Sequence, residues 1–302
     1  MKKILIAGTG SIGSEIAYLF SNEYEVICVD HGKYFQKIKE ILPKVKLIKG
    51  DIYDYDLMKS FHDVDIVFYC IDTGGVVSCI DYYAKYYDIN ITKFKKFINS
   101  FTNSSSHFYL FSSCYVYPDV LNITEDTKLN AETQYGVLRA NQEKILVESG
   151  IKYTILRLSN IFGYGNFFHV GNFGAIEKFI DLVLNRGEIS LHGNGEQIVN
   201  YLYKEDLMSL IKILVNYQQN KIYNISSGQS RSIHEIAKII KNIALEEYNI
   251  HIEIIKLDEN VKLPNSPCIQ PNKVMQETSW KPSSDLESVI KKMMAVYLEH
   301  KR

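Results

Sequence analysis

Short apolar runs alternate with helical patterns through the first half of the chain. The runs cover residues 4–7, 26–30, 45–48, 66–71, 108–111 and 153–156. Apolar residues at helical spacing occupy residues 12–20, 80–101 and 137–148 between them. Continuous apolar runs separated by helices are typical of strands that are buried on both faces of a parallel sheet. The pattern therefore predicts βαβ units in a doubly wound sheet, with the carboxyl ends of the strands along one edge.

The second half of the chain has a different pattern. Glycine-containing loops at residues 163–165 and 171–174 come first. Helical patterns follow at residues 175–184, 204–217, 233–247 and 286–297. We predict an α/β protein with a Rossmann-type doubly wound parallel sheet in residues 1–165 and a smaller C-terminal α/β lobe in residues 166–302. Residues 200–226 are a candidate return to the first domain, through a strand at residues 223–225.

A glycine-rich turn joins the first apolar run to the first helical pattern. Gly8, Gly10 and Gly13 have the G-x-G-x-x-G spacing of a dinucleotide-binding turn. In such a turn the first glycine permits a tight bend, the second admits a pyrophosphate, and the third lets the helix pack closely on the strand. The diphosphate would lie on the helix N-terminus, at Ser11 and Ile12. A glycine turn without a ligand is the alternative.

An acidic residue at the end of the second apolar run supports the ligand-binding interpretation. Asp30 follows the turn by about 20 residues, as the dinucleotide fingerprint requires. A carboxylate at this point binds the hydroxyls of the adenosine ribose and repels a 2′-phosphate. We therefore predict NAD(H) as the cofactor in preference to NADP(H).

Composition narrows the class of partner. The 302 residues include 34 lysines and arginines against 35 acidic residues, a formal net charge of −1, which gives no basis for binding nucleic acid or an anionic membrane. The five cysteines are scattered without a C-x-x-C pair, so we expect reduced thiols and no metal site. No segment approaches the ~18 apolar residues of a membrane span, and no signal peptide precedes the first strand. We expect a cytoplasmic protein with a small-molecule substrate.

A hydroxyl, a phenol and a guanidinium form the candidate catalytic set. Ser113 ends the fifth apolar run, and Tyr135 and Arg139 share one face of the following helix because they are four residues apart. A tyrosine is a weak base, with an unperturbed pKa of about 10, but a nearby guanidinium favours the phenolate. Ser113 would then hydrogen-bond the reacting oxygen, while Tyr135 exchanges its proton and a nicotinamide exchanges hydride. By spacing alone, the simpler interpretation is that Tyr135 is an ordinary tyrosine, one of 22, and that Arg139 is a solvated charge on the helix.

The order of these features along the chain resembles the extended short-chain dehydrogenase/reductase family of nucleotide-sugar epimerases, dehydratases and 4-ketoreductases. The matching motifs after the glycine turn are Gly50-Asp51-Ile52, Asn90-Ile91, Ser112-Ser113 with Val116-Tyr117, Thr124-Glu125-Asp126, Tyr135-Gly136, Leu156-Arg157 with Asn160 to Gly163, Gly193-Asn194-Gly195, Tyr203 with Asp206, and Trp280-Lys281-Pro282.

The resemblance implies roles for several residues. By position, Asp51 and Ile52 would contact the adenine, Ser113 would polarise the substrate, Tyr135 would act as acid and base, and Asn160 would contact the substrate. The resemblance also implies NAD as cofactor, a nucleotide sugar as substrate, and a homodimer formed through two helices of each subunit.

Several positions depart from the family pattern. Arg139 occupies the position of the lysine that holds the nicotinamide ribose beside the tyrosine, and the two cations differ in geometry. Val199 stands where relatives commonly have an arginine that grips the substrate diphosphate, and residues 262–266 contain no second arginine. Asp72 follows the fourth apolar run, where cofactor and substrate should meet, and is a candidate substrate contact or loop cap.

The residues after Ser113 bear on the type of reaction. Sugar 4,6-dehydratases place an Asp-Glu pair directly after the active-site hydroxyl residue, whereas this chain has Cys114-Tyr115. An epimerase or a ketoreductase needs only the hydroxyl, the tyrosine, a cation and the nicotinamide. We interpret the chain as an NAD(H)-dependent epimerase or ketoreductase acting on a sugar carbinol or keto carbon. The alternative is a catalytically weak or inactive NAD-binding regulatory or scaffold protein, suggested by Arg139 and Val199.

Overall fold

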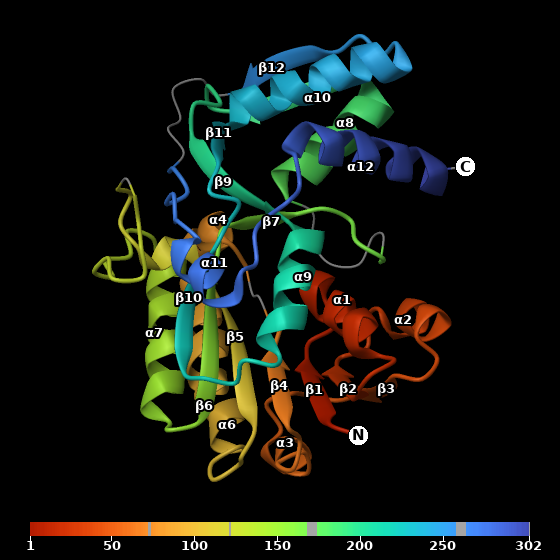
Figure 1. Ribbon diagram of the computed structural model, residues 1–302. Coiled ribbons are helices and arrows are strands. Elements are labelled where there is room, and N and C mark those ends of the chain that lie inside the picture. Colours follow the sequence, from red (N-terminus) through yellow and green to blue (C-terminus); the bar gives the residue numbers. More distant parts are fainter. Residues whose placement is uncertain (72–73, 121, 168–173, 258–263, 302) are drawn as a thin grey trace.

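A parallel sheet forms the centre of the larger part of the molecule (Figure 1). The computed structural model describes residues 1–71, 74–120, 122–167, 174–257 and 264–301. Among these residues, seven strands form a sheet in the order β10-β6-β5-β4-β1-β2-β3, and every neighbouring pair is parallel. The strands are β1 (Lys3–Ala7), β2 (Glu25–Asp30), β3 (Lys46–Lys49), β4 (Ile66–Tyr69), β5 (His107–Ser113), β6 (Lys152–Leu158) and β10 (Lys221–Ile225). The predicted Rossmann-type sheet is confirmed, including the return of the chain at residues 223–225.

Helices cover both faces of this sheet, which explains why its strands read as continuous apolar runs. Along β1, Ile4 and Ile6 belong to one apolar core, whereas Leu5 and Ala7 belong to the other. The first core includes side chains from α1 (Ser11–Phe20), α2 (Phe35–Ile41), α9 (Lys204–Leu214) and α11 (Asn272–Thr278). The second core includes side chains from α3 (Tyr55–Lys59), α6 (Phe94–Asn99) and α7 (Gln134–Glu148).

The strand order reverses beside β1, which pairs with β2 on one side and with β4 on the other. Connections leave in opposite directions from such a switch point, and this opens a crevice at the carboxyl ends of the strands. The glycine turn, the segment after β4 and the end of β5 all face this crevice.

A smaller lobe lies beyond the carboxyl ends of the strands (Figure 1). It contains the three-stranded sheet β11-β9-β7, the parallel pair β12-β8 and three helices around a separate apolar core. Its elements are β7 (Asn160–Phe162), α8 (Ala175–Arg186), β8 (Glu188–His192), β9 (Ile198–Tyr203), β11 (Ser230–Ser232), α10 (Ile233–Tyr248), β12 (Glu253–Leu257) and α12 (Leu286–Lys301). The chain enters this lobe, returns to the large sheet through α9 and β10, and enters it again. The domain boundary at residue 165 stays a prediction.

The segment over residues 80–101 is largely helical, as its apolar spacing indicates, but it is divided into four elements. The segment consists of α4 (Val76–Asp81), α5 (Tyr83–Tyr87), the π-helical turn η1 (Asp88–Lys93) and α6. Asn90, which is 3 % exposed, donates its side-chain Nδ2–H to the Tyr86 carbonyl at 2.8 Å. Short polar side chains that bond to the preceding turn compete with the regular helical ladder, and π-helical turns insert an extra residue.

Candidate active site

The glycine turn between β1 and α1 is shaped by two close approaches and one open position. Gly8 has φ +96°, and a Cβ on Gly13 would lie 2.0 Å from the Gly8 carbonyl oxygen. Gly13 is therefore required by the packing of α1 on the turn. A Cβ on Gly10 would meet nothing within 4 Å, and Gly10 is the N-cap of α1 without any side-chain cap. The open space and the uncapped N-terminal amides fit a bound diphosphate.

Asp30 ties the end of β2 to the glycine turn. Its Oδ2 accepts a hydrogen bond from the Thr9 backbone N–H at 2.8 Å, and its Oδ1 accepts one from the Gly32 N–H at 3.0 Å. Each carboxylate oxygen keeps a lone pair that can accept a ribose hydroxyl. Farther along this edge, Asp51 is exposed and Ile52 is buried.

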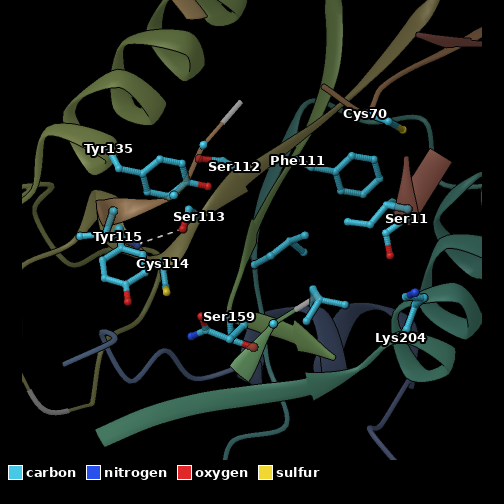
Figure 2. A pocket seen from close by; sticks show the side chains of 18 of the residues that line it. Ser11, Cys70, Phe111, Ser112, Ser113, Cys114, Tyr115, Tyr135, Ser159 and Lys204 are labelled. Carbon is cyan, nitrogen blue, oxygen red and sulfur yellow. Dashed lines mark hydrogen bonds between the residues drawn. The ribbon is translucent and has the colours of Figure 1, made fainter. Parts of the chain in front are cut away.

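A cavity of about 600 Å³ extends from the start of α1 to the end of β5 and into the smaller lobe. Figure 2 shows Ser113, Tyr135 and Tyr115 on one side of it and Ser11 and Lys204 on the other. The structure therefore brings the three candidate catalytic residues together with the start of α1 and with Asn160, whereas Asp30, Asp51 and Ile52 lie outside this cavity. The predicted residues that line the cavity are Ser11, Ile12, Ser113, Tyr135, Arg139 and Asn160. Asp72 lies outside the described residues.

Ser113 and Tyr135 are held in place by the junction between β5 and α7. Ser113 is 7 % exposed, and its Oγ accepts a hydrogen bond from the Tyr115 N–H at 3.4 Å. The Thr133 hydroxyl caps α7 by accepting from the Gly136 N–H at 3.0 Å. A Cβ on Gly136 would lie 1.9 Å from the Tyr115 carbonyl oxygen. The first turn of α7, which carries Tyr135, thus rests directly on the backbone that follows Ser113.

Arg139 lies against the ring of Tyr135. Its guanidinium carbon is 5.1 Å from the ring centroid, and the arginine is only 3 % exposed. Its Nη1 donates a hydrogen bond to the Gln142 Oε1 at 2.9 Å. The predicted pairing of the two residues on one helix face is present, and the simpler interpretation of Arg139 as a solvated helix charge is wrong.

Asn160 lines the cavity from the first position of β7. Its Nδ2 donates to the Asn200 carbonyl at 3.2 Å and to the Ser266 Oγ at 2.9 Å. The amide nitrogen therefore ties together three segments of the chain, and the side-chain oxygen is the atom that can serve a ligand.

Two buried charges in the cavity wall were missed by sequence reasoning. Lys204 is 5 % exposed and donates to the Tyr164 carbonyl at 3.3 Å; burial lowers the pKa of its ammonium. Glu177 is 4 % exposed and accepts from the Gly163 N–H at 2.7 Å; burial raises the pKa of its carboxyl. Both residues lie in the first turn of a helix, where the sequence pattern reads as a solvated charge.

The described residues contain no group of three His, Cys, Asp or Glu side chains that could hold a metal ion. None of the described helices is long and apolar enough to cross a bilayer.

The fold and this site define a dinucleotide-binding enzyme architecture with a serine and a tyrosine facing the cofactor crevice. The chain belongs to the NAD dependent epimerase/dehydratase family, whose model matches residues 4–226. The predicted family, enzyme class and NAD cofactor are thereby confirmed at the level of the family.

One named relative and two solved structures resemble this chain over nearly its whole length. The UDP-glucose 4-epimerase of Lactobacillus helveticus is 26% identical, over 94% of this chain and 93% of that protein. The structure of the UDP-N-acetylglucosamine 4-epimerase of Methanobrevibacter ruminantium, solved with UDP-N-acetylmuramic acid, has a TM-score of 0.86 at 23% identity and covers 99% of each chain. The UDP-glucuronic acid 4-epimerase of Bacillus cereus, solved with UDP-glucuronic acid and NAD, has a TM-score of 0.85 at 20% identity, over 99% of this chain and 100% of that one.

Proposed function

We propose that the protein is an NAD(H)-dependent epimerase that inverts a carbinol carbon of a nucleotide-linked sugar. The observation that carries this proposal is the meeting of Ser113, Tyr135 and the uncapped start of α1 in one cavity. The family match and the full-length similarity to a UDP-glucose 4-epimerase support the choice of reaction and substrate class.

The chain's residues divide the work between the cofactor and the sugar. Backbone amides at Gly10 and Ser11 would bind the diphosphate of NAD, and Asp30 would bind the adenosine ribose. NAD, when bound, supplies the acceptor and then the donor of a hydride. Tyr135 takes the proton of the sugar hydroxyl and later returns it, and Ser113 hydrogen-bonds the same oxygen. The Arg139 guanidinium, beside the ring of Tyr135, favours the phenolate.

The two residues after Ser113 favour epimerisation over dehydration. Cys114 is 1 % exposed, and burial raises the pKa of its thiol to about 11. Burial also raises the pKa of the Tyr115 hydroxyl. Neither side chain carries a charge at neutral pH, so this position lacks the acid and base pair that an elimination of water uses.

Arg231 supplies a guanidinium close to the position where Val199 departs from the family pattern. The two residues lie directly opposite each other in the antiparallel pair of β9 and β11, so their side chains project to the same face. Arg231 is exposed, and its Nη1 donates to the Ser230 carbonyl at 2.9 Å. We assign the contact with the substrate diphosphate to Arg231.

Activity should be tested with the NAD-loaded protein and a panel of UDP-glucose, UDP-galactose, UDP-N-acetylglucosamine and UDP-glucuronic acid. An epimerase converts a sugar to its epimer without net consumption of NADH, whereas a ketoreductase consumes NADH with a 4-keto sugar nucleotide. Tyr135→Phe should abolish turnover while NADH binding, measured by calorimetry, persists. Tyr217→Phe, at a tyrosine that is 45 % exposed, is the matched control.

Other outcomes of the same experiment separate the alternatives. Tight NADH binding without turnover of any sugar nucleotide would favour a regulatory or scaffold protein of the same fold. Absence of binding to either NADH or NADPH would contradict both. Arg231→Ala should raise the KM for the sugar nucleotide about tenfold, the order expected for a hydrogen bond to a charged group, and leave NADH affinity unchanged. Arg186→Ala, at an exposed arginine on α8, is its control.

The protein is proposed to be a homodimer and to reside in the cytoplasm. Large apolar side chains are exposed on the neighbouring helices α4, α5 and α7, notably Ile80 (67 %), Tyr87 (45 %) and Val137 (39 %). A second copy would bury them, and sedimentation of the wild type and of Ile80→Glu checks this interface. All five cysteines are free thiols, which is consistent with a reducing compartment.

A further inference from the structure

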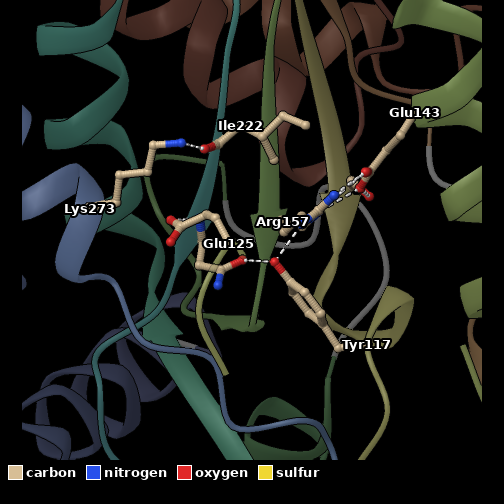
Figure 3. A network of polar contacts seen from close by, with 8 residues as sticks. Tyr117, Glu125, Glu143, Arg157, Ile222 and Lys273 are labelled. Atoms are coloured by element: carbon tan, nitrogen blue, oxygen red, sulfur yellow. Dashed lines mark hydrogen bonds and ion pairs between the residues drawn. The ribbon is translucent and has the colours of Figure 1, made fainter. Parts of the chain in front are cut away.

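A buried ion pair joins α7 to strand β6 of the central sheet (Figure 3). Glu143 of α7 and Arg157 of β6 approach to 2.7 Å, and each side chain is only 5 % exposed. Arg157 donates to both Glu143 oxygens, through Nε at 3.1 and 3.2 Å and through Nη2 at 2.7 Å. Burial opposes the charge of Arg157, but these hydrogen bonds outweigh burial and raise the pKa of its guanidinium.

Further contacts fix the orientation of this pair. The Ser112 hydroxyl donates to the Glu143 Oε1 at 2.5 Å, and the Arg157 Nη1 donates to the Tyr117 hydroxyl at 2.5 Å. The Tyr117 hydroxyl in turn donates to the Asn224 Oδ1 on β10 at 2.9 Å. Glu143 is therefore held by Ser112 on β5, and Arg157 by Tyr117 just beyond β5, so the Glu143 carboxylate is directed toward the sheet.

The position of Glu143 on α7 gives this arrangement a consequence for the active site. Tyr135, Arg139 and Glu143 are spaced four residues apart and share one helix face. A carboxylate one turn from Arg139 is within reach of its guanidinium, and an ion pair between them would compete with the position of Arg139 beside the Tyr135 ring. Arg157 prevents this competition because, together with the Ser112 hydroxyl, it supplies two donors to each carboxylate oxygen.

We propose that Arg157 is a positioning residue for the acid/base site: by holding the Glu143 carboxylate toward β6, it leaves the Arg139 guanidinium against the ring of Tyr135. The inference rests on the proposed role of Tyr135. It assigns a role to a residue that lines neither the cofactor crevice nor the substrate cavity in the described structure.

Direct titration of Tyr135 tests the proposal without any substrate. The phenolate signal is obtained by near-ultraviolet difference absorbance between each protein and its Tyr135→Phe counterpart, with and without NAD. Arg157→Met should move the ionisation midpoint of Tyr135 upward by about one pH unit, because Glu143 then draws Arg139 away. Adding Glu143→Gln to Arg157→Met should return the midpoint to the wild-type value. Glu148→Gln, the same chemical change on the exposed end of α7, should have no effect.

A purely structural role gives a different pattern. In that case the double variant would titrate like Arg157→Met or at still higher pH, and this result would overturn the proposal, as would an unchanged midpoint in Arg157→Met. If Arg157→Met does not fold, Arg157→Lys gives the same comparison. It should raise the ionisation midpoint of Tyr135 by a smaller amount, and adding Glu143→Gln should remove that increase. The proposed function is tested separately: sugar-nucleotide turnover that survives Tyr135→Phe would contradict it. The titration of Tyr135 uses no substrate and does not depend on that result.

Discussion

Two glycines of the same turn should respond differently to one added methyl group: Gly13→Ala should lose stability, and Gly10→Ala should lose cofactor affinity. In Gly13→Ala the new Cβ would lie 2.0 Å from the Gly8 carbonyl oxygen and 3.2 Å from the Cys70 Cβ. Backbone cannot yield as a flexible side chain does, so α1 must shift from the turn. Overpacking of this kind costs about 1–3 kcal/mol or more. We expect a lower melting temperature, by about 2–4 °C for each kcal/mol.

Gly10→Ala should leave the fold intact and weaken cofactor binding. Its Cβ would meet nothing within 4 Å, and the backbone has φ −74°, which alanine adopts without strain. Alanine lowers the entropy of the unfolded chain, which stabilises the fold, but it is a poorer N-cap than glycine, which destabilises it. The two effects oppose each other, so the free energy of unfolding should change by less than about 1 kcal/mol. The methyl group would occupy the space proposed for the diphosphate, and NADH affinity should fall about tenfold or more.

Thermal melts of the apoproteins and calorimetric titration with NADH give both readouts for both variants. Gly10→Ala serves as the stability control for Gly13→Ala, because the same chemical change is made three residues away. Wild-type NADH affinity in Gly10→Ala would refute the placement of the diphosphate. Wild-type stability in Gly13→Ala would refute the packing argument.

Two further predictions concern buried polar groups. His107 is fully buried, and burial lowers its pKa to about 4. The folded protein therefore favours the neutral ring. About 3 kcal/mol of folding stability, present above about pH 6.5, should be lost as the pH falls toward 4. His107→Gln should flatten this dependence in denaturant melts at about pH 7 and about pH 4.5, and an equally steep dependence in the variant would contradict the assignment. Arg139→Lys should reduce turnover about tenfold and stability by about 1–3 kcal/mol, because lysine cannot both contact the Tyr135 ring and reach Gln142. Faster turnover in Arg139→Lys would instead show that the arginine impairs the activity of the site.

The central sheet could be predicted from the sequence because each strand is buried on both faces. Burial on two faces demands an unbroken apolar run, and the run in residues 108–111 fell within the observed β5, His107–Ser113. The glycine turn was equally readable, because Gly8 has a positive φ and Gly13 lies directly against the Gly8 carbonyl, five residues away. Local constraints of this kind leave a direct mark on the sequence.

The elements that the sequence did not reveal depend on distant or side-chain contacts. The strands β8 and β12 are each five residues long and join segments that are about sixty residues apart, and β12 has no buried residue, so the pairing cannot be seen from either segment alone. The π-helical turn depends on where the Asn90 side chain finds an acceptor. The buried positions of Lys204 and Glu177 depend on the loop that includes Gly163 and Tyr164, which lies over both helix starts.

Arg139 illustrates how a departure from a family pattern changes meaning once its neighbours are known. From the sequence alone, Arg139 in place of the family lysine suggested a catalytically weak or inactive protein. In the structure its guanidinium covers the ring of Tyr135 and donates to the fully buried Gln142. The only carboxylate one turn farther along the same helix face is bound by Arg157. An arginine that had replaced the lysine without compensation would not be expected to have specific partners. Here the Tyr135 ring and Gln142 contact the guanidinium, and Arg157 binds the Glu143 carboxylate that could compete for it. The arrangement therefore supports the proposed acid/base role of Tyr135 with a guanidinium beside it.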